Sequence, residues 1–237
     1  MLTPTSIRFQ AWTAMVKVRP HRGDRLRRPL NVLAAAVLIV LTAPLMLVVA
    51  LLVRLTSRGP ALYKQQRVGL DRRVDRASSK LNPRRNHDSG GRIFTIYKFR
   101  TMYHRKAITA EQMQVWAAKN DPRVTPLGRV LRAFRLDELP QLFNILAGDM
   151  NLVGPRPEQP AIFNDIRQEL SNYRRRQRVL PGITGLAQVS LPYDSDLEDV
   201  RKKVDLDLQY LRKRSPGEDF RIMVRTMPVM VGRKGAR

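Results

Sequence analysis

The longest apolar run of the chain lies near its start. From Leu30 to Val53, 24 consecutive residues carry no charged side chain. A straight helix of that length would be about 36 Å long, enough to cross the hydrocarbon core of a bilayer. The length of this run, and the lack of a small-residue cleavage site after it, argue against a cleavable signal peptide. The pattern therefore predicts a membrane helix within residues 30–56.

Two features bear on how this helix meets the bilayer. Pro44, near its middle, removes a helical hydrogen bond and crowds the preceding turn, so it kinks or breaks the helix. Seven Lys and Arg residues lie in residues 1–29 before the run, and six lie in residues 54–73 after it. Basic flanks favour the cytoplasm, so a helix that enters, breaks at Pro44 and returns would satisfy both flanks. An ordinary kinked transmembrane helix is the other interpretation, and these features alone favour neither.

Beyond the membrane segment, the pattern changes to the two-residue alternation of strands. Residues 61–68 and 93–100 are predicted to form a short β-hairpin. The polar stretch 71–91 between them contains Arg-Arg, Ser-Ser and Gly-Gly pairs. We expect it to be a long loop inserted in the hairpin.

The rest of the chain mostly shows the period of amphipathic helices. One helix is predicted to begin at Pro126 with Thr125 as its cap, and another to run from about Glu138 to Ala147 and to stop at Gly148. Further helices are expected at residues 107–119, 158–178, 197–211 and 220–231. The last one mixes Met, Val and Ile with arginines, which suits either an interfacial helix or a helix packed on the core. The predicted fold class is α+β and mostly helical.

The amino-acid composition excludes several kinds of catalytic and metal site. The 237 residues include 44 Lys and Arg against 20 Asp and Glu, a formal net charge of +24. The chain has no cysteine and only three histidines, which excludes disulfides, thiol nucleophiles and cysteine-based metal sites, and disfavours a Ser-His-Asp triad. So basic a chain suits either nucleic acid or phosphates at an anionic membrane, and the apolar run favours the membrane.

Two adjacent acids, Asp137 and Glu138, follow three arginines spaced three residues apart. Asp137 in front of Glu138-Leu139-Pro140 suits a helix N-cap, where the helix dipole favours an acid. Catalysis by the carboxylates is the other interpretation, and spacing alone favours the cap. The two roles are compatible, because a helix N-terminus also attracts anions.

Two further motifs could contact phosphate. In Gly154-Pro155-Arg156-Pro157 an arginine stands between two prolines, which restrict the backbone and could present a guanidinium with little loss of entropy. A plain rigid turn explains this motif equally well. Residues 181–189 place Gly182 and Gly185 in an expected loop, whose backbone N–H groups could line a nucleotide pocket, although the spacing is neither that of a Walker loop nor that of a Rossmann loop.

Taken together, these motifs resemble those of the bacterial sugar transferase family, the monotopic phosphoglycosyl transferases. The resemblance covers roughly residues 28–235. The matching segments are YKFRTM at 97–102, DPRVTPLGRVLRAFRLDELPQLFNILAGDMNLVGPRP at 121–157, PGITGLAQV at 181–189, and a closing DLQYL, S, DF and T between Asp207 and Thr226.

The resemblance implies an enzyme that transfers sugar-1-phosphate from a UDP-sugar to undecaprenyl (polyprenyl) phosphate and so initiates polysaccharide or glycoconjugate synthesis. It implies that Asp137 is the nucleophile of a phosphosugar-aspartyl intermediate, and that Glu138 assists it. Both acids would hold Mg²⁺, which prefers carboxylate, phosphate and water oxygens. Lys98, Arg132 and Arg156 match basic residues that bind phosphate groups.

The resemblance also implies a re-entrant membrane helix, broken in the family at a Ser-Pro pair that stands here as Ala43-Pro44. The implied organisation is a basic segment at 1–29, a re-entrant helix at 30–56, and a catalytic domain at 57–237 with the insertion 71–91. That domain would lie on the cytoplasmic face of the bacterial inner membrane, in contact with lipids and not with nucleic acid.

Two alternatives remain at this point. A transferase that spans the bilayer could join its substrates directly, with no covalent intermediate. A non-enzymatic, membrane-tethered protein could bind nucleic acid or anionic lipid through its positive charge. The second alternative leaves the acid pair, the Gly-Pro-Arg-Pro motif and the glycine loop unexplained.

Overall fold

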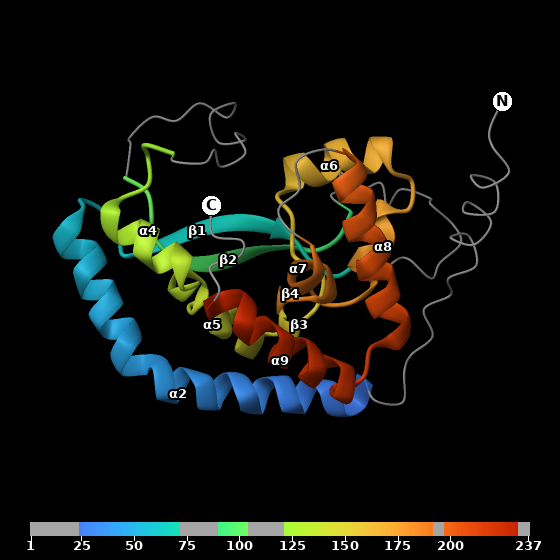
Figure 1. Cartoon of the computed structure of the whole chain (residues 1–237), viewed down its shortest axis with the longest axis horizontal. Coiled ribbons are helices and arrows are strands. Elements are labelled where there is room, and N and C mark those ends of the chain that lie inside the picture. Colours follow the sequence, from blue (N-terminus) through green and yellow to red (C-terminus); the bar gives the residue numbers. More distant parts are fainter. Residues whose placement is uncertain (1–23, 72–89, 104–120, 192–196, 232–237) are drawn as a thin grey trace, which may run out of the picture.

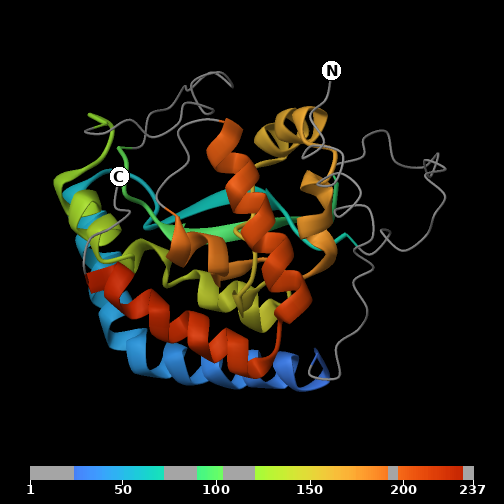
Figure 2. The same ribbon diagram turned by 45° about the vertical axis from the view of Figure 1, so that its right-hand side comes forward.

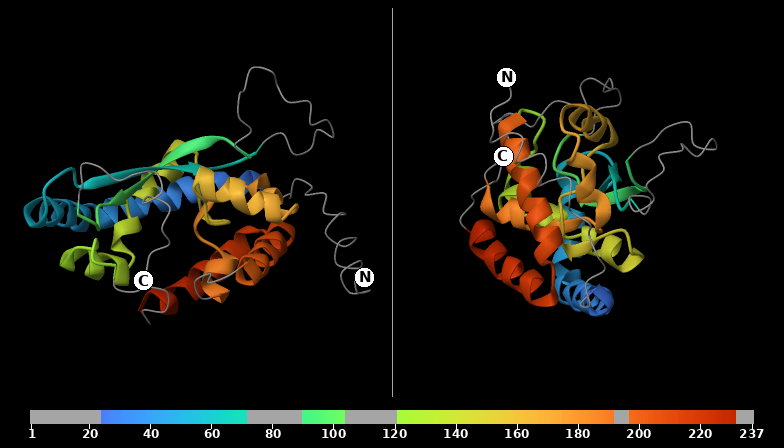
Figure 3. Two further views of the ribbon diagram at one scale, coloured as in Figure 1. Left: turned by 90° about the horizontal axis from the view of Figure 1, so that it is seen from above. Right: turned by 90° about the vertical axis from the view of Figure 1, so that its right-hand side faces the viewer.

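One long helix and two small sheets organise the computed structural model, which describes residues 24–71, 90–103, 121–191 and 197–231. Most of the predicted 71–91 insertion and the whole predicted helix 107–119 lie outside these residues. The described part is mostly helical with short strands, as predicted (Figure 1). Seen from above, the β1–β2 hairpin and helix α9 lie on opposite sides of the molecule (Figure 3).

The apolar run forms helix α2, Asp24–Thr56, which begins six residues before the apolar run itself. It passes through Pro44 as one helix, so the proline bends the helix and does not end it. Figure 1 shows the bend in the middle of α2: its first half runs beneath the other elements, and its second half turns up towards β1. The predicted break at Pro44 is therefore a kink.

Helix α2 buries only one narrow face. Ala35, Met46, Val49 and Val53 pack on the rest of the protein. Of the 18 most apolar consecutive residues of this helix, only 17% are buried inside the protein. The core helix of a soluble protein would be mostly covered. By length and composition, α2 is the one described helix that could cross a membrane. Its outer face leaves large aliphatic side chains uncovered, among them Leu33, Val40, Leu41, Leu47, Leu51 and Leu55.

The predicted hairpin is confirmed. Strand β1, Leu62–Val68, pairs antiparallel with β2, Ile93–Phe99, with Leu62 opposite Phe99 and Val68 opposite Ile93. Phe94 and Ile96 alternate along β2 and are buried beneath helix α5, as the two-residue period requires. The hairpin thereby brings Lys98, near the end of β2, to the interior of the protein.

A second sheet was not predicted. Strand β3, Asn151–Val153, pairs in parallel with β4, Gly182–Thr184. A Cβ atom on Gly182 would lie 2.1 Å from the backbone nitrogen of Gly154, so only glycine allows this close approach. The N–H of Gly182 donates to the carbonyl of Pro155 at 3.0 Å. The expectation that Gly182 lies in a loop with a free N–H for a nucleotide is therefore wrong.

Helix α4, Pro126–Ala133, begins as predicted. The side-chain oxygen of Thr125 accepts a hydrogen bond from the N–H of Gly128 at 2.8 Å, and Pro126 occupies the first turn, where its missing N–H costs nothing. A 3-10 turn, η1, covers Leu136–Glu138, and α5 covers Gln141–Ala147. Helix α5 ends at Gly148, as predicted, with φ of 90°.

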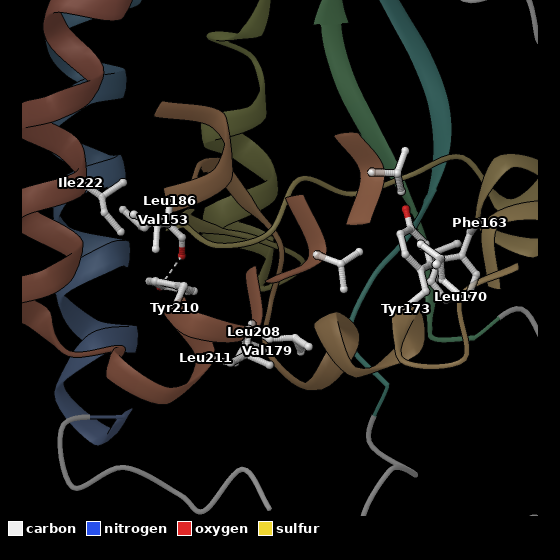
Figure 4. Packing of buried hydrophobic residues seen from close by; sticks show 13 residues of the cluster. Val153, Phe163, Leu170, Tyr173, Val179, Leu186, Leu208, Tyr210, Leu211 and Ile222 are labelled. Atoms are coloured by element: carbon white, nitrogen blue, oxygen red, sulfur yellow. Dashed lines mark hydrogen bonds between the residues drawn. The ribbon is translucent and has the colours of Figure 1, made fainter. Parts of the chain in front are cut away.

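The single helix predicted for residues 158–178 is wrong. Helix α6, Pro160–Glu169, ends where Leu170 adopts an extended conformation, and the 3-10 helix η2, Tyr173–Arg178, follows. Leu170 and Tyr173 both turn into the largest apolar cluster, and this burial outweighs the helical period (Figure 4).

Three helices complete the chain: α7, Leu186–Ser190; α8, Leu197–Lys213; and α9, Pro216–Val231. Helix α8 extends slightly past its predicted end, and α9 begins four residues before its predicted start. Near its start, α9 meets the start of α2, where Asp219 pairs with Arg27 at 2.8 Å, and from there it crosses in front of α2 in the views of Figures 1 and 2. In the core, Tyr210 of α8 donates its hydroxyl to the carbonyl of Val153 at 3.0 Å, which ties α8 to β3 (Figure 4).

Candidate active site

The acid pair lies in the turn between α4 and α5. Arg135, between α4 and η1, adopts the left-handed conformation with φ of 56°, which costs a non-glycine residue about 1 kcal/mol. The chain then reverses through η1 and buries both acids, leaving Asp137 8% and Glu138 6% exposed. Helix α5 starts only at Gln141, with Pro140 before it and no side-chain cap. Asp137 is therefore not the N-cap that its spacing suggested, because the 3-10 turn separates it from the helix.

Glu138 lies among three cations from three different segments of the chain. Its Oε1 atom accepts from Lys98 Nζ at 2.8 Å and from Arg156 Nη2 at 3.0 Å, and its Oε2 atom lies 4.0 Å from Arg135 Nη1. Burial acts to raise the pKa of the Glu138 carboxyl, but these cations outweigh it and hold that pKa well below its usual range. Glu138 is thus a fixed anion that organises the surrounding cations.

Asp137 has different surroundings. No hydrogen bond or ion pair joins its carboxylate to another residue in the described part of the chain. Burial, and then the neighbouring charge of Glu138, raise the pKa of Asp137, while Lys98, Arg132 and Arg156 act against that rise. A carboxylate that is buried, unpaired and close to cations is available to react or to bind a ligand.

Arg132 contributes from beside the pair. Its Nε atom donates to Thr101 Oγ1 at 2.9 Å, and the carbonyl of Thr101 accepts from the N–H of Thr125 at 3.0 Å. These bonds fix Arg132 close enough to Asp137 to lower the pKa of the Asp137 carboxyl, although the two side chains form no ion pair. The structure therefore brings Lys98, Arg156 and Glu138 into contact and places Arg132 at the edge of the same site.

Sequence reasoning missed several residues of this site. Arg135 and Thr101 were not proposed as site residues, although Arg135 belongs to the spaced arginine series and Thr101 to the 97–102 motif. Arg67 and Arg176, which hydrogen-bond to the loop carrying Arg156, come from two other segments of the chain. No local pattern marks that association.

The donor set suits Mg²⁺ better than a metal held by protein alone. In the described residues, no group of three or more His, Cys, Asp or Glu side chains lies together. Mg²⁺ is commonly bound by one or two carboxylates together with substrate phosphates and water. The unpaired Asp137 carboxylate and the adjacent Glu138 fit that requirement.

The structure thus combines a buried acid pair, with Lys98 and Arg156 on one of its carboxylates, and a largely uncovered helix that is long and apolar enough to cross a membrane. Residues 23–233 match the family model described as bacterial sugar transferase. The chain belongs to this family.

Relatives carry names consistent with that membership. A "UDP-glucose:undecaprenyl-phosphate glucose-1-phosphate transferase" of Caulobacter vibrioides is 40% identical over 211 residues, covering 88% of this chain and 70% of the relative. A "UDP-N-acetylgalactosamine-undecaprenyl-phosphate N-acetylgalactosaminephosphotransferase" of Aeromonas hydrophila is 39% identical over 212 residues, covering 90% and 45%. An Escherichia coli glucose-1-phosphate transferase is 35% identical over 204 residues, covering 85% and 39%. The chain thus spans less than half of the last two relatives.

Proposed function

We propose that this protein transfers sugar-1-phosphate from a UDP-sugar to undecaprenyl phosphate, and so begins the assembly of a polysaccharide or glycoconjugate. The names of the relatives supply the substrate class. The observation that carries the mechanism is the contrast between the two acids: Glu138 is ion-paired with Lys98 and Arg156, and Asp137 has no ion-pair or hydrogen-bond partner among the described residues. A basic tether for nucleic acid or lipid would need neither feature.

In the proposed first step, a carboxylate oxygen of Asp137 attacks the phosphorus that carries the sugar. A new O–P bond forms, the bond to the bridging oxygen breaks, and UMP leaves with that electron pair. The product on the protein is a phosphosugar-aspartyl intermediate. In the second step, a phosphate oxygen of undecaprenyl phosphate attacks the same phosphorus and releases the Asp137 carboxylate.

The cations of the site offset the charge that this reaction gathers. A diphosphate donor meets a carboxylate, and a phosphate acceptor follows, so anions must approach one another. Lys98 and Arg156, already oriented by Glu138, would hold the donor phosphates, with Arg132 at the edge of the site. Because Glu138 keeps its negative charge, these cations stay ordered before the substrate arrives.

We also propose that Asp137 and Glu138 hold Mg²⁺ together with the donor phosphates. The metal, when bound, would supply further positive charge to the diphosphate. Asp137 needs such support, because its buried charge is disfavoured by its surroundings.

For the membrane helix, we propose the re-entrant arrangement on the cytoplasmic face of the inner membrane. The supporting observation is that the same domain contacts both ends of α2. Arg27, near the start, donates to Asp219 Oδ2 of α9 at 2.8 Å, and Arg100, after β2, donates to the carbonyls of Val53 and Ser57 at 3.1 and 2.7 Å. A helix that crossed the bilayer would place these polar contacts on opposite sides of it.

The uncovered apolar side chains of α9, Phe220, Val224 and Met227, suit the proposed interfacial position of that helix. They lie on a helix that carries Arg221 and Arg225 as well. Apolar side chains could enter the acyl boundary while the arginines meet lipid phosphates.

The function is tested by UMP release. Purified protein with Mg²⁺ and a panel of UDP-sugars is expected to release UMP in a burst without lipid acceptor, to become labelled by the sugar-phosphate, and to turn over continuously once undecaprenyl phosphate is added. UMP release only in the presence of acceptor would favour direct transfer between the two substrates. No release from any UDP-sugar would overturn the proposed activity.

A further inference from the structure

The loop that carries Arg156 is fixed through its carbonyl groups. Four consecutive carbonyls, from Pro155 to Glu158, each accept a hydrogen bond from a different group. The donors, in order, are the N–H of Gly182 at 3.0 Å, the Arg176 guanidinium at 3.0 Å, the Arg67 guanidinium at 3.0 Å and the N–H of Val68 at 2.9 Å. Four separate contacts therefore determine the path of a four-residue loop.

This pattern has a chemical reason. Pro155 and Pro157 have no N–H group, so the loop offers few donors of its own. Each proline ring fixes φ but leaves ψ free, and ψ sets the direction of the carbonyl. Hydrogen bonds to the carbonyls therefore restrict the angles that the prolines do not.

The two arginines among the donors are joined by one acid. Arg176 Nη1 lies 3.4 Å from Glu158 Oε1, and Arg67 Nη1 lies 3.9 Å from Glu158 Oε2. Arg176 is fully buried and also pairs with Asp207 of α8 at 2.7 Å. We call Arg67, Glu158 and Arg176 the carbonyl clamp. A buried guanidinium costs free energy unless it is paired, and these acids provide the pairing.

We propose that the carbonyl clamp positions Arg156 for catalysis: it fixes the backbone of the loop so that the Arg156 guanidinium is presented to the phosphates of the donor. The inference rests on the proposed function, since it assumes that Arg156 meets those phosphates. The Arg156 guanidinium donates to Glu138 at 3.0 Å, and the carbonyl of Arg156 accepts a hydrogen bond from Arg176. Arg67 and Arg176 are thus positioning residues that act through Arg156.

A double-mutant cycle tests the clamp. Arg67→Met removes the donor to Pro157 and is expected to lower kcat/KM for UMP release about tenfold in the wild-type background. In an Arg156→Ala background, the same change should cost less than twofold, because the residue being positioned is gone. Arg67→Lys keeps a cation near Glu158 but loses the planar group that reaches both Gln65 and Pro157, and should show the same dependence on Arg156.

Lys203→Met is the matched control. Lys203 pairs with the Glu158 carboxylate at 3.1 Å, so the change removes a cation from this region and leaves both clamp arginines in place. Its kcat/KM should stay within twofold of wild type. Thermal unfolding of every variant checks that it is folded. If Arg67→Met does not fold, Arg67→Lys replaces it in the double-mutant cycle.

The outcomes separate this inference from the proposed function. An equal loss in both backgrounds would show that Arg67 acts independently of Arg156, for example by touching phosphate itself, and would overturn the clamp. A loss of kcat/KM below twofold for Arg67→Met in the wild-type background would also overturn the carbonyl clamp. In either case, UMP release by the wild-type protein would leave the proposed function standing, whereas a wild-type protein that releases none would remove that function.

Discussion

Asp137 and Glu138 are consecutive buried acids with opposite electrostatic surroundings. The Glu138 carboxylate lies among Lys98, Arg156 and Arg135, and no hydrogen bond or ion pair joins the Asp137 carboxylate to another described residue. Burial acts to raise the pKa of Glu138, but the neighbouring cations outweigh it and hold that pKa low. The pKa of Asp137 is raised, mainly by burial. This contrast assigns different roles to two neighbouring carboxylates.

Asp137→Asn is expected to lower UMP release by about a thousandfold or more, because the amide is a poor nucleophile. The protein should remain folded, since Asp137 is not a helix cap. At neutral pH its melting temperature should match or exceed that of wild type, because a buried and disfavoured charge is removed. Substantial turnover by this variant would exclude Asp137 as the nucleophile.

Glu138→Gln should impair both stability and activity. The change leaves Lys98 and Arg156 without their shared counter-ion, and breaking a buried pair in this way costs about 3 kcal/mol. UMP release should fall at least about a hundredfold, because the phosphate-binding cations are no longer oriented. Denaturant unfolding and steady-state kinetics measure the two effects. Wild-type stability in this variant would show that Glu138 does not organise the cations.

Stability should also depend on acid pH through Glu138. Its pKa is lowered on folding, so its contribution is complete above the pKa of the unfolded chain, near 4.5, and is lost as the pH falls towards the lower pKa of the folded protein. Unfolding free energy should therefore decrease below about pH 4.5. The decrease should be shallower in Glu138→Gln, and equal slopes in the two proteins would contradict the assignment.

Arg156→Lys keeps the positive charge but loses the planar guanidinium that can contact a phosphate with two nitrogens. We expect kcat/KM to fall at least about tenfold with little change in melting temperature. The structure supports this separation, because hydrogen bonds to the carbonyl groups hold the loop, and a lysine side chain keeps a cation beside Glu138. Activity within twofold of wild type would reduce Arg156 to a turn residue.

The re-entrant arrangement predicts that both ends of α2 face the same side of the membrane. Arg25 and Arg58 are exposed at its two ends, and the chain has no cysteine of its own. Single variants Arg25→Cys and Arg58→Cys should both react with a membrane-impermeant thiol reagent only from the cytoplasmic side. Pro44→Leu restores the missing hydrogen bond and should shift some molecules towards a spanning helix. Labelling of the two positions from opposite sides would disprove the arrangement.

Local patterns determined the elements whose causes are local. The alternation of β1 and β2, the Thr125–Pro126 start of α4 and the Gly148 end of α5 follow from residues a few positions apart. The apolar run of α2 was equally clear. The motifs also include five polar residues that the fold brings close together: Lys98, Arg132, Asp137, Glu138 and Arg156.

Tertiary structure decided how these parts meet. Leu170 ends α6 because its side chain enters the core, although the helical period continues past it. Asp137 lies in a 3-10 turn because Arg135 reverses the chain, and so it loses the cap role that its spacing suggested. In both places, burial or a backbone turn outweighed the local preference.

The same holds for the long-range ion pairs and hydrogen bonds of the protein. Lys98 is 40 positions from Glu138, Arg67 is 90 positions from Pro157, and Arg27 is 192 positions from Asp219. A sequence of many arginines does not specify which one meets which acid, since any of them has a suitable charge. The packing of β1, β2 and η2 around residues 154–158 selects the partners, because only buried charges that find an acid or a carbonyl can stay in the interior.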